Sequence, residues 1–123
     1  MLAESDVVSL HVPLTEATRG MTGTDALGRM MPGAVLVNTA RGALTDEVAL
    51  VGALREGRIG AAGLDVFVRE PAEADNPLFE LPNVVVAPHV AWLTLETLDR
   101  SLAVAADNCR RLRAGEPLRH RVV

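Results

Sequence analysis

Four short apolar runs rich in β-branched residues are the feature that most constrains the fold of this chain. They are VVSLHV at 7–12, AVLVNTA at 34–40, AAGLDVF at 61–67 and VVVAPHV at 84–90. None of these runs alternates polar with apolar residues, as a strand with one face in water would. We therefore expect four strands of a parallel sheet that is buried by helices on each side.

Helices are predicted between and after these runs. A helix in TDEVALVGALREG would begin after Thr45 as its N-cap, carry acidic residues in its first turn and end at Gly57. A shorter helix is expected over 24–30, and a single helical turn after Thr15. A last helix is predicted over about 94–114, because apolar residues recur there at helical spacing: Leu98, Leu102, Ala105, Cys109 and Leu112.

The alternation of strands and helices indicates the fold class. It is typical of an α/β fold with right-handed crossovers, in which the proline-rich segment 69–83 would be a long connection. A doubly wound sheet of the Rossmann type has about six strands and a G-x-G-x-x-G turn after the first. This chain offers four runs, and no such turn follows any of them. We therefore predict a partial Rossmann-type parallel sheet with a long C-terminal helix.

Composition limits the function classes. The 123 residues, 49% of them hydrophobic, suit one compact domain. The formal net charge of −4 and the scarcity of aromatic residues argue against binding to nucleic acid or to an anionic membrane. The single cysteine, Cys109, excludes an internal disulfide and a multi-cysteine metal site. Because there is no signal-like N-terminus and no apolar run of about 20 residues, we expect a cytoplasmic protein.

Three of the predicted strands end in polar residues that could perform chemistry. In α/β sheets, ligands bind at the carboxyl ends of the strands, so we expect these side chains to converge. The residues are Asn38, Thr39 and Arg41 after the second strand, Asp65 and Glu70 after the third, and His89 after the fourth.

Each main candidate also has a purely structural interpretation. Arg41 could grip a carboxylate with two hydrogen bonds, or could be a surface arginine paired with Asp46 or Glu47. His89 could donate a proton to a carbonyl oxygen, or could be a hydrogen-bonded histidine of the core. Glu70 could reach and orient that imidazole, or could be only an acid of the loop.

Longer motifs resemble those of the D-isomer-specific 2-hydroxyacid dehydrogenase family. They are HVPLTEATRGM, LVNTARGALTDEVALVGALREGRIGAAGLDVFVREP and NPLFELPNVVVAPHVAW, in the family's order and spacing, and they cover nearly the whole chain. The resemblance implies that residues 1–123 form an incomplete NAD-binding domain, with 94–114 as the C-terminal helix. On this interpretation the substrate domain and the first βαβ half of the nucleotide domain are absent.

The resemblance also implies a role for each catalytic candidate. Arg41 corresponds to the family arginine that binds the substrate carboxylate and carbonyl. His89 corresponds to the acid and base that exchanges the hydroxyl proton as hydride moves between C2 and the nicotinamide, and Glu70 to its glutamate partner. Hydride transfer changes the charge on oxygen, which Arg41 and a protonated His89 would stabilise.

Cofactor contacts are implied by the same resemblance. NAD is the expected cofactor, with NADP left open because the residue that reads the ribose lies outside this sequence. The corresponding residues are His11, Val12, Pro13 and Thr18 near the ribose, Thr39, Ala40 and Asp65 around the nicotinamide, and Ala91 near the carboxamide.

The sequence departs from the family pattern at two places. It reads Val90-Ala91-Trp92 where many members have a glycine pair, and Ala43 stands where glycine is frequent. The Ala-Trp form resembles members that act on glycerate or hydroxypyruvate, although Trp92 is also interpretable as a core or interface aromatic.

Two functional hypotheses follow. The first is an NAD(P)-dependent oxidoreductase acting on the CH–OH group of a small D-2-hydroxy acid, with little activity as an isolated chain. The second is a non-catalytic interaction module derived from that domain, because a half sheet leaves an unpaired edge and apolar surface. Either way, the expected partners are a small 2-hydroxy or 2-keto acid and a second copy of the chain or a polypeptide that supplies the missing half.

Overall fold

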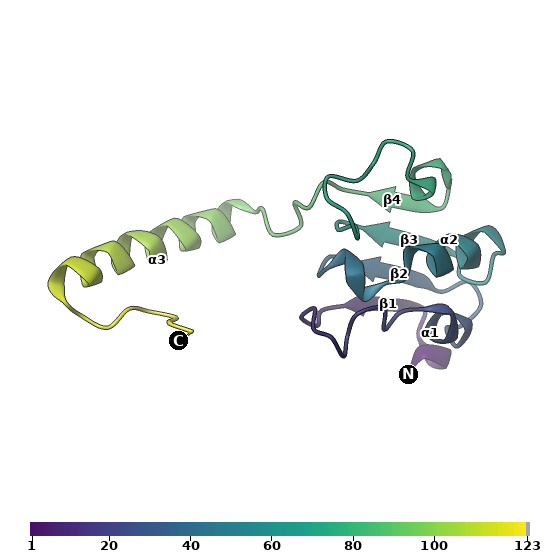
Figure 1. Ribbon diagram of the computed structural model, residues 1–123, viewed down its shortest axis with the longest axis horizontal. Coiled ribbons are helices and arrows are strands. Elements are labelled where there is room, and N and C mark those ends of the chain that lie inside the picture. The colour runs from purple at the N-terminus through teal and green to yellow at the C-terminus, as the bar shows by residue number, and fades with distance from the viewer. Residues whose placement is uncertain (123) are drawn as a thin grey trace. The chain divides into compact units, whose positions relative to one another are not determined.

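The computed structural model describes residues 1–122, which form two compact units, one over Met1–Val90 and one from Ala91 onward. The first unit contains a four-stranded parallel sheet in the order β1-β2-β3-β4 (Figure 1). The strands are β1 (Val7–Leu10), β2 (Val35–Asn38), β3 (Ala61–Leu64) and β4 (Val84–Val86). The four predicted strands and the parallel sheet are confirmed, although each strand is shorter than its apolar run.

Two α-helices and three short 3-10 helices complete the first unit. They are η1 (Leu2–Glu4), α1 (Thr24–Gly28), η2 (Gly42–Leu44), α2 (Glu47–Arg55) and η3 (Pro77–Glu80). The turn predicted after Thr15 is present, because the amide of Arg19 donates to the Thr15 carbonyl at 3.0 Å, but it does not extend into a helix. The predicted long connection at 69–83 is interrupted by η3.

The hydrophobic core lies between one face of the sheet and the two α-helices. Its fully buried members are mostly leucines, such as Leu36 from β2, Leu27 from α1 and Leu50 from α2. Since neighbouring residues of a strand point to opposite faces, the partners of Leu36 in the register, Ala62 on β3 and Val84 on β4, belong to the same face. The packing of aliphatic side chains therefore fixes which face of each strand is turned toward the helices.

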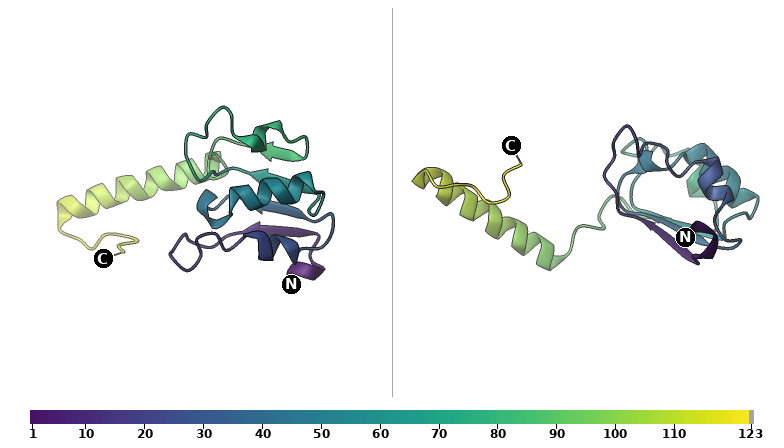
Figure 2. Two further views of the ribbon diagram at one scale, coloured as in Figure 1. Left: turned by 45° about the vertical axis from the view of Figure 1, so that its right-hand side comes forward. Right: turned by 90° about the horizontal axis from the view of Figure 1, so that it is seen from below.

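The other face of the sheet is open in the first unit, which corrects the expectation of helices on each side. Val7 is 58% exposed and Val85 is 75% exposed, and both point away from the core. Figure 2 shows α1 and α2 on the same face of the sheet. The reason is topological: the strand order advances in one direction from β1 to β4, and right-handed crossovers that advance in one direction place every helix on one face.

The start of α2 lies one residue later than predicted. Asp46, not Thr45, is the N-cap, and its Oδ1 accepts hydrogen bonds from the amides of Val48 at 3.0 Å and Ala49 at 3.1 Å. Thr45 is instead buried, and its side-chain Oγ1 accepts from Asn38 Nδ2 at 3.4 Å. A side chain that is engaged inside the protein cannot turn outward to cap a helix.

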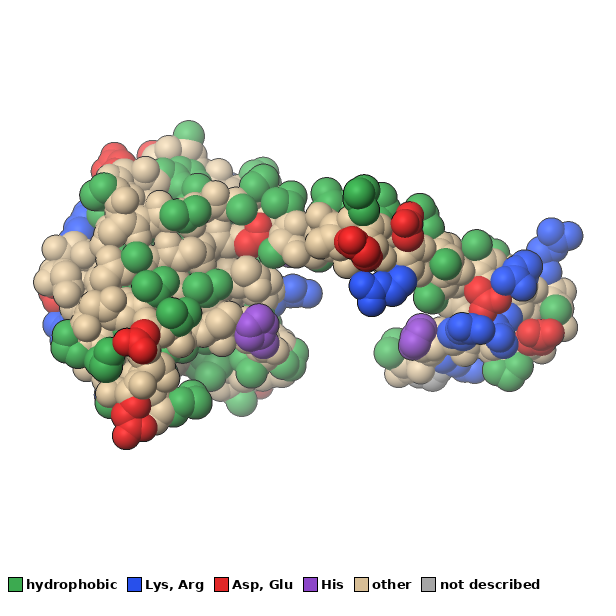
Figure 3. Space-filling model, turned by 180° about the vertical axis from the view of Figure 1, so that it is seen from behind, with side chains coloured by type: hydrophobic (Ala, Val, Ile, Leu, Met, Phe, Trp, Pro, Cys, Tyr) green, Lys and Arg blue, Asp and Glu red, His purple; other side chains and the backbone are tan. Residues whose placement is uncertain are grey.

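The second unit consists of α3 (Leu95–Ala114) and the residues after it. The predicted helix is confirmed: Thr94 caps its N-terminus, and Gly115 ends it with a φ of 67° in the left-handed region. Asp107 accepts from Arg111 at 2.9 Å and from Arg119 at 2.8 Å, so the segment around Arg119 folds back on the helix. Figure 3 shows the basic and acidic side chains gathered at this end of α3. Over residues 1–122, no helix combines the length and the apolar character that crossing a bilayer requires.

The difference between the two sheet faces predicts unequal effects of truncating their side chains. Leu36→Ala should lower the free energy of unfolding by about 2–5 kcal/mol, because Leu36 is fully buried in the core. Val85→Ala should change it by less than about 0.5 kcal/mol, because the side chain already meets water. Urea denaturation followed by circular dichroism measures both, and equal losses would contradict the one-sided core.

Candidate active site

The candidate site lies at the edge of the sheet where the parallel strands end. Arg41 follows β2 and precedes η2, Asp65 follows β3 directly, and His89 follows β4. The backbone pairing continues beyond the strands, since the amide of Asp65 donates to the Asn38 carbonyl at 3.0 Å. The expected convergence of the three loops at one sheet edge is therefore what the topology produces.

Asn38 holds the loop that carries Arg41. Its side chain is almost completely buried; its Nδ2 donates to the Arg41 carbonyl at 2.9 Å, and its Oδ1 accepts from the Ala40 amide at 3.1 Å. A buried amide with both ends hydrogen-bonded is a rigid anchor, because releasing either partner would leave a buried polar group unsatisfied. The sequence marked Asn38 as a polar residue at a strand end but did not reveal this role.

The Arg41 side chain is exposed, and its Nη1 donates to the Ala40 carbonyl at 2.6 Å. In the described part of the chain, no ion pair joins it to Asp46 or Glu47, the surface partners considered from the sequence. The guanidinium is thus accessible to a ligand from solvent.

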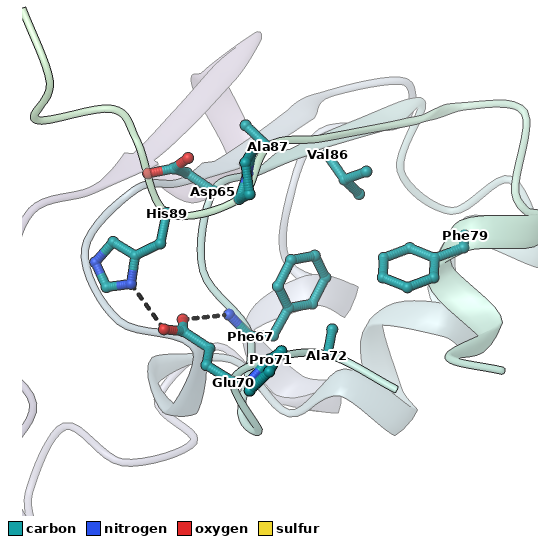
Figure 4. A pocket seen from close by; sticks show the side chains of 10 residues that line it. Asp65, Phe67, Glu70, Pro71, Ala72, Phe79, Val86, Ala87 and His89 are labelled. Carbon is teal, nitrogen blue, oxygen red and sulfur yellow. Dashed lines mark hydrogen bonds and ion pairs between the residues drawn. The ribbon is translucent and has the colours of Figure 1, made fainter. Parts of the chain in front are cut away.

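Glu70 and His89 form the central contact of the site. Glu70 Oε2 lies 2.7 Å from His89 Nδ1, and Glu70 Oε1 accepts from the Phe67 amide at 3.0 Å (Figure 4). The hydrogen bond from His89 is the largest cause that lowers the pKa of Glu70, followed by the Phe67 amide, with smaller contributions from the charges of His89 and Arg41. Gly42, the residue after Arg41, lies directly against the Phe67 backbone, whose amide donates to Glu70, so the loop that carries Arg41 adjoins the pair.

The backbone of His89 adopts an uncommon conformation. Its φ is 57°, in the left-handed region that a histidine seldom occupies. The next amide, that of Val90, donates to Asp65 Oδ1 at 2.8 Å, and Asp65 is 4% exposed. A buried carboxylate that receives this amide holds the turn in place. The His89 side chain is 41% exposed, so the interpretation as a core histidine is wrong.

A cavity of about 390 Å³ adjoins the pair. Figure 4 shows Asp65, Glu70 and His89 on one side of it and Val86 and Phe79 on the other. Phe67 and Phe79 pack edge to face, with ring centroids 5.5 Å apart. A mostly apolar cavity with a few convergent polar groups is typical of a small-molecule site. The apolar wall was not predicted from the sequence, because Phe79 reaches it from η3, within the segment that was expected to be a long connection.

The loop after β1 contains four of the residues implied as cofactor contacts. His11 Nε2 lies 2.8 Å from Ser9 Oγ, and Thr18 Oγ1 donates to the Pro13 carbonyl at 2.8 Å, while Val12 is partly exposed. Thr39 and Ala40, beside Arg41, are half-buried. Ala91 is the first residue of the second unit, so its contact with the carboxamide stays a prediction. Within residues 1–122, groups of three or more His, Cys, Asp or Glu that could hold a metal ion do not occur.

Comparison with known proteins gives matches over most of the chain. The family model described as D-isomer specific 2-hydroxyacid dehydrogenase, NAD binding domain, matches residues 1–91. A glyoxylate reductase from Korarchaeum cryptofilum is 52% identical over 116 residues, which are 94% of this chain and 35% of that protein. A glycerate dehydrogenase from Methylorubrum extorquens is 46% identical over 119 residues, 95% of this chain and 38% of that protein.

A solved structure shows the same arrangement. The crystal structure of D-lactate dehydrogenase with NAD+ from Lactobacillus jensenii superimposes with a TM-score of 0.89 and 35% identity, over 99% of this chain and 40% of that chain. The chain thus spans little more than a third of the length of the relatives that it matches.

The lowered pKa of Glu70 predicts a pH-dependent contribution to stability. A carboxyl whose pKa falls on folding stabilises the folded state above its ordinary value of 4.5, and that contribution disappears as the pH falls through the lowered value. Wild type should therefore be more stable than Glu70→Gln at about pH 6, and the difference should shrink toward about pH 3. Parallel urea denaturations measure it; a difference that grows on acidification would contradict the contact.

Proposed function

This chain belongs to the family of D-isomer specific 2-hydroxyacid dehydrogenases, and on that premise we propose that it supplies the carboxylate-binding and acid–base groups for reduction of a small 2-keto acid to its D-2-hydroxy acid. The observation that carries the proposal is the 2.7 Å contact of Glu70 with His89, with Arg41 in the loop that adjoins this pair. The proposed activity is that of an NAD-dependent oxidoreductase.

The residues of this chain fit the nicotinamide end of NAD. Thr39 and Ala40 are half-buried beside Arg41, and Asp65 lines the cavity, all at the carboxyl ends of parallel strands, where such folds bind dinucleotides. When bound, the nicotinamide would give or take up the hydride. Contacts to the pyrophosphate are not proposed for this chain, because no glycine-rich turn follows any of its strands.

The roles of the three side chains follow from their chemistry. The planar guanidinium of Arg41 can hold the substrate carboxylate with two parallel hydrogen bonds and thereby orient the neighbouring carbonyl. Glu70 holds His89 by Nδ1, so Nε2 is the ring atom that would give a proton to the carbonyl oxygen in reduction. In the reverse direction the same atom would take the hydroxyl proton.

We propose glyoxylate or hydroxypyruvate as the substrate. Glyoxylate and glycerate occur in the names of two relatives, and the Ala91-Trp92 pair resembles members that act on such small acids. A cytoplasmic location is proposed with it. A chain with a single cysteine has no internal disulfide and so fits a reducing compartment, and the proposed substrates are soluble metabolites.

A segment exchange tests the reaction. This chain should replace the matching segment of the Korarchaeum cryptofilum glyoxylate reductase and retain NADH-dependent reduction of glyoxylate and hydroxypyruvate, with NADPH assayed in parallel. His89→Asn should lower kcat by about 10²–10⁴-fold, because the proton donor is lost. Arg41→Ala should raise KM as well as lower kcat, because carboxylate binding is lost.

Arg29→Ala is the matched control, since Arg29 is an exposed arginine paired with Asp25 on α1, and it should leave both constants unchanged. The isolated chain should bind NADH weakly, as measured by Trp92 fluorescence, and show little turnover. An inactive exchange protein that folds normally, or full activity after His89→Asn, would refute the proposed roles.

A second candidate function is favoured by the open face of the sheet. Exposed valines on one sheet face, Val7 and Val85, form apolar surface of the kind that mediates association. On this alternative the chain is a non-catalytic interaction module that pairs through this face with a second copy of itself.

Sizing chromatography with light scattering tests the alternative. The wild-type chain should run as one defined oligomer without response to NADH, and Val7→Glu with Val85→Glu should convert it to a monomer. Val48→Glu, a substitution of an even more exposed valine on α2, should leave the oligomer intact. A monomeric wild-type chain would exclude self-association through this face.

A further inference from the structure

The carboxylate of Glu47, at the start of α2, binds the loop that carries Glu70. Its Oε1 accepts from the Val68 amide at 2.7 Å, and its Oε2 accepts from Asn76 Nδ2 at 3.3 Å. These donors lie 21 and 29 residues further along the chain and come from the two ends of the 68–76 loop. We infer that Glu47 is a positioning residue that fixes this loop and, through Glu70, the imidazole of His89. The part that this positioning plays in catalysis rests on the proposed reaction.

The attachment at Val68 is next to the hydrogen bond that orients Glu70. Glu70 Oε1 accepts from the Phe67 amide, and Phe67 precedes Val68 directly. Holding the Val68 amide therefore fixes the direction of the Phe67 amide, which in turn fixes the carboxylate that contacts His89. A carboxylate that accepts from a backbone amide forms a charge-assisted bond, which is stronger than a bond between neutral groups.

A close backbone contact acts on the same segment. A Cβ added to Gly42 would lie 1.9 Å from the carbonyl carbon of Phe67, so only glycine permits this approach. Gly42 follows Arg41, and Glu47 begins the next helix. The segment from Gly42 to Glu47 thus holds the loop after β3 at two adjacent points, by contact at Phe67 and by hydrogen bonding at Val68.

The far end of the 68–76 loop is oriented by the same carboxylate. Asn76 donates its amide hydrogen to Glu47, while its Oδ1 accepts from the Leu78 amide at 3.0 Å and caps η3. The side chain of Asn76 therefore links the start of α2 to η3, the element that brings Phe79 to the wall of the cavity.

Two substitutions separate the reach of the Glu47 side chain from its charge. Glu47→Asp keeps the negative charge at the helix N-terminus but is one methylene too short to reach the Val68 amide. Glu47→Gln loses the charge but keeps an oxygen at the same reach. If Glu47 acted only by its charge, Gln would lower the pKa of Glu70 by removing a like charge, and Asp would leave it unchanged.

Titration of the Glu70 side-chain carbon by nuclear magnetic resonance on the full chain distinguishes these cases. Glu47→Asp should raise the pKa of Glu70 toward the value that His89→Asn produces, because a misplaced carboxylate loses its hydrogen bonds. Glu47→Gln should not raise it. Glu56→Ala, which removes an exposed glutamate just after the same helix, is the matched control and should leave the pKa of Glu70 at its wild-type value.

Hydrogen exchange of the Val68 amide gives a second, independent readout. In the unmodified chain this amide should be protected, and Glu47→Asp should remove about tenfold or more of that protection. Rapid exchange at Val68 in the unmodified chain would overturn the inference without any variant, even if Glu47→Asp failed to fold. A wild-type pKa of Glu70 in a folded Glu47→Asp protein would overturn it as well.

The titration of Glu70 and the hydrogen exchange of Val68 use neither substrate nor cofactor. Their outcomes are therefore independent of the outcome of the segment exchange. An inactive exchange protein together with a raised Glu70 pKa in Glu47→Asp would refute the reaction and retain the positioning by Glu47. An active exchange protein together with an unchanged Glu70 pKa would retain the reaction and refute the positioning.

Discussion

Parallel pairing of β2, β3 and β4 is the constraint on which the candidate site depends. Because the three strands run in the same direction, their carboxyl ends meet at one edge, and the loops after them are neighbours. The sheet hydrogen bonds extend into those loops: the Asp65 amide donates to the Asn38 carbonyl at 3.0 Å, and the Ala87 amide to the Leu64 carbonyl at 2.9 Å. The loops with Arg41 and His89 are therefore attached directly to the hydrogen-bond ladder of the sheet.

Buried polar groups supply the next level of organisation. Asn38 and Asp65 are 1% and 4% exposed, and burial of such groups is unfavourable unless they are hydrogen-bonded. Both side chains form hydrogen bonds to loops of the site. Asn38 binds the loop that carries Arg41, and Asp65 accepts from the turn at His89. No buried side-chain nitrogen or oxygen in residues 1–122 lacks a partner. The hydrogen bonds that compensate for burying Asn38 and Asp65 thus also orient the loops that carry the candidate catalytic groups.

The one-sided sheet follows from the strand order, and the chain spans only part of the length of its relatives. A doubly wound sheet covers its second face because its strand order reverses and the crossovers then run the other way. The strand order of this chain does not reverse, and the chain matches 35% of the length of the Korarchaeum cryptofilum relative. Val7 and Val85 accordingly lie on a face that the helices of the first unit leave uncovered.

The sequence by itself determined the strands, the ends of the helices at Gly57 and Gly115, and the identity of the reactive side chains. These features are local: apolar runs, glycines with positive φ and polar residues at strand ends act within a few neighbouring residues. The one-sided core, the left-handed conformation of His89 and the attachment of Glu47 to the Val68 amide were decided only by the tertiary structure. Each of these features depends on contacts between segments that are distant in the sequence. Only the packing of the sheet and its helices brings such segments close together.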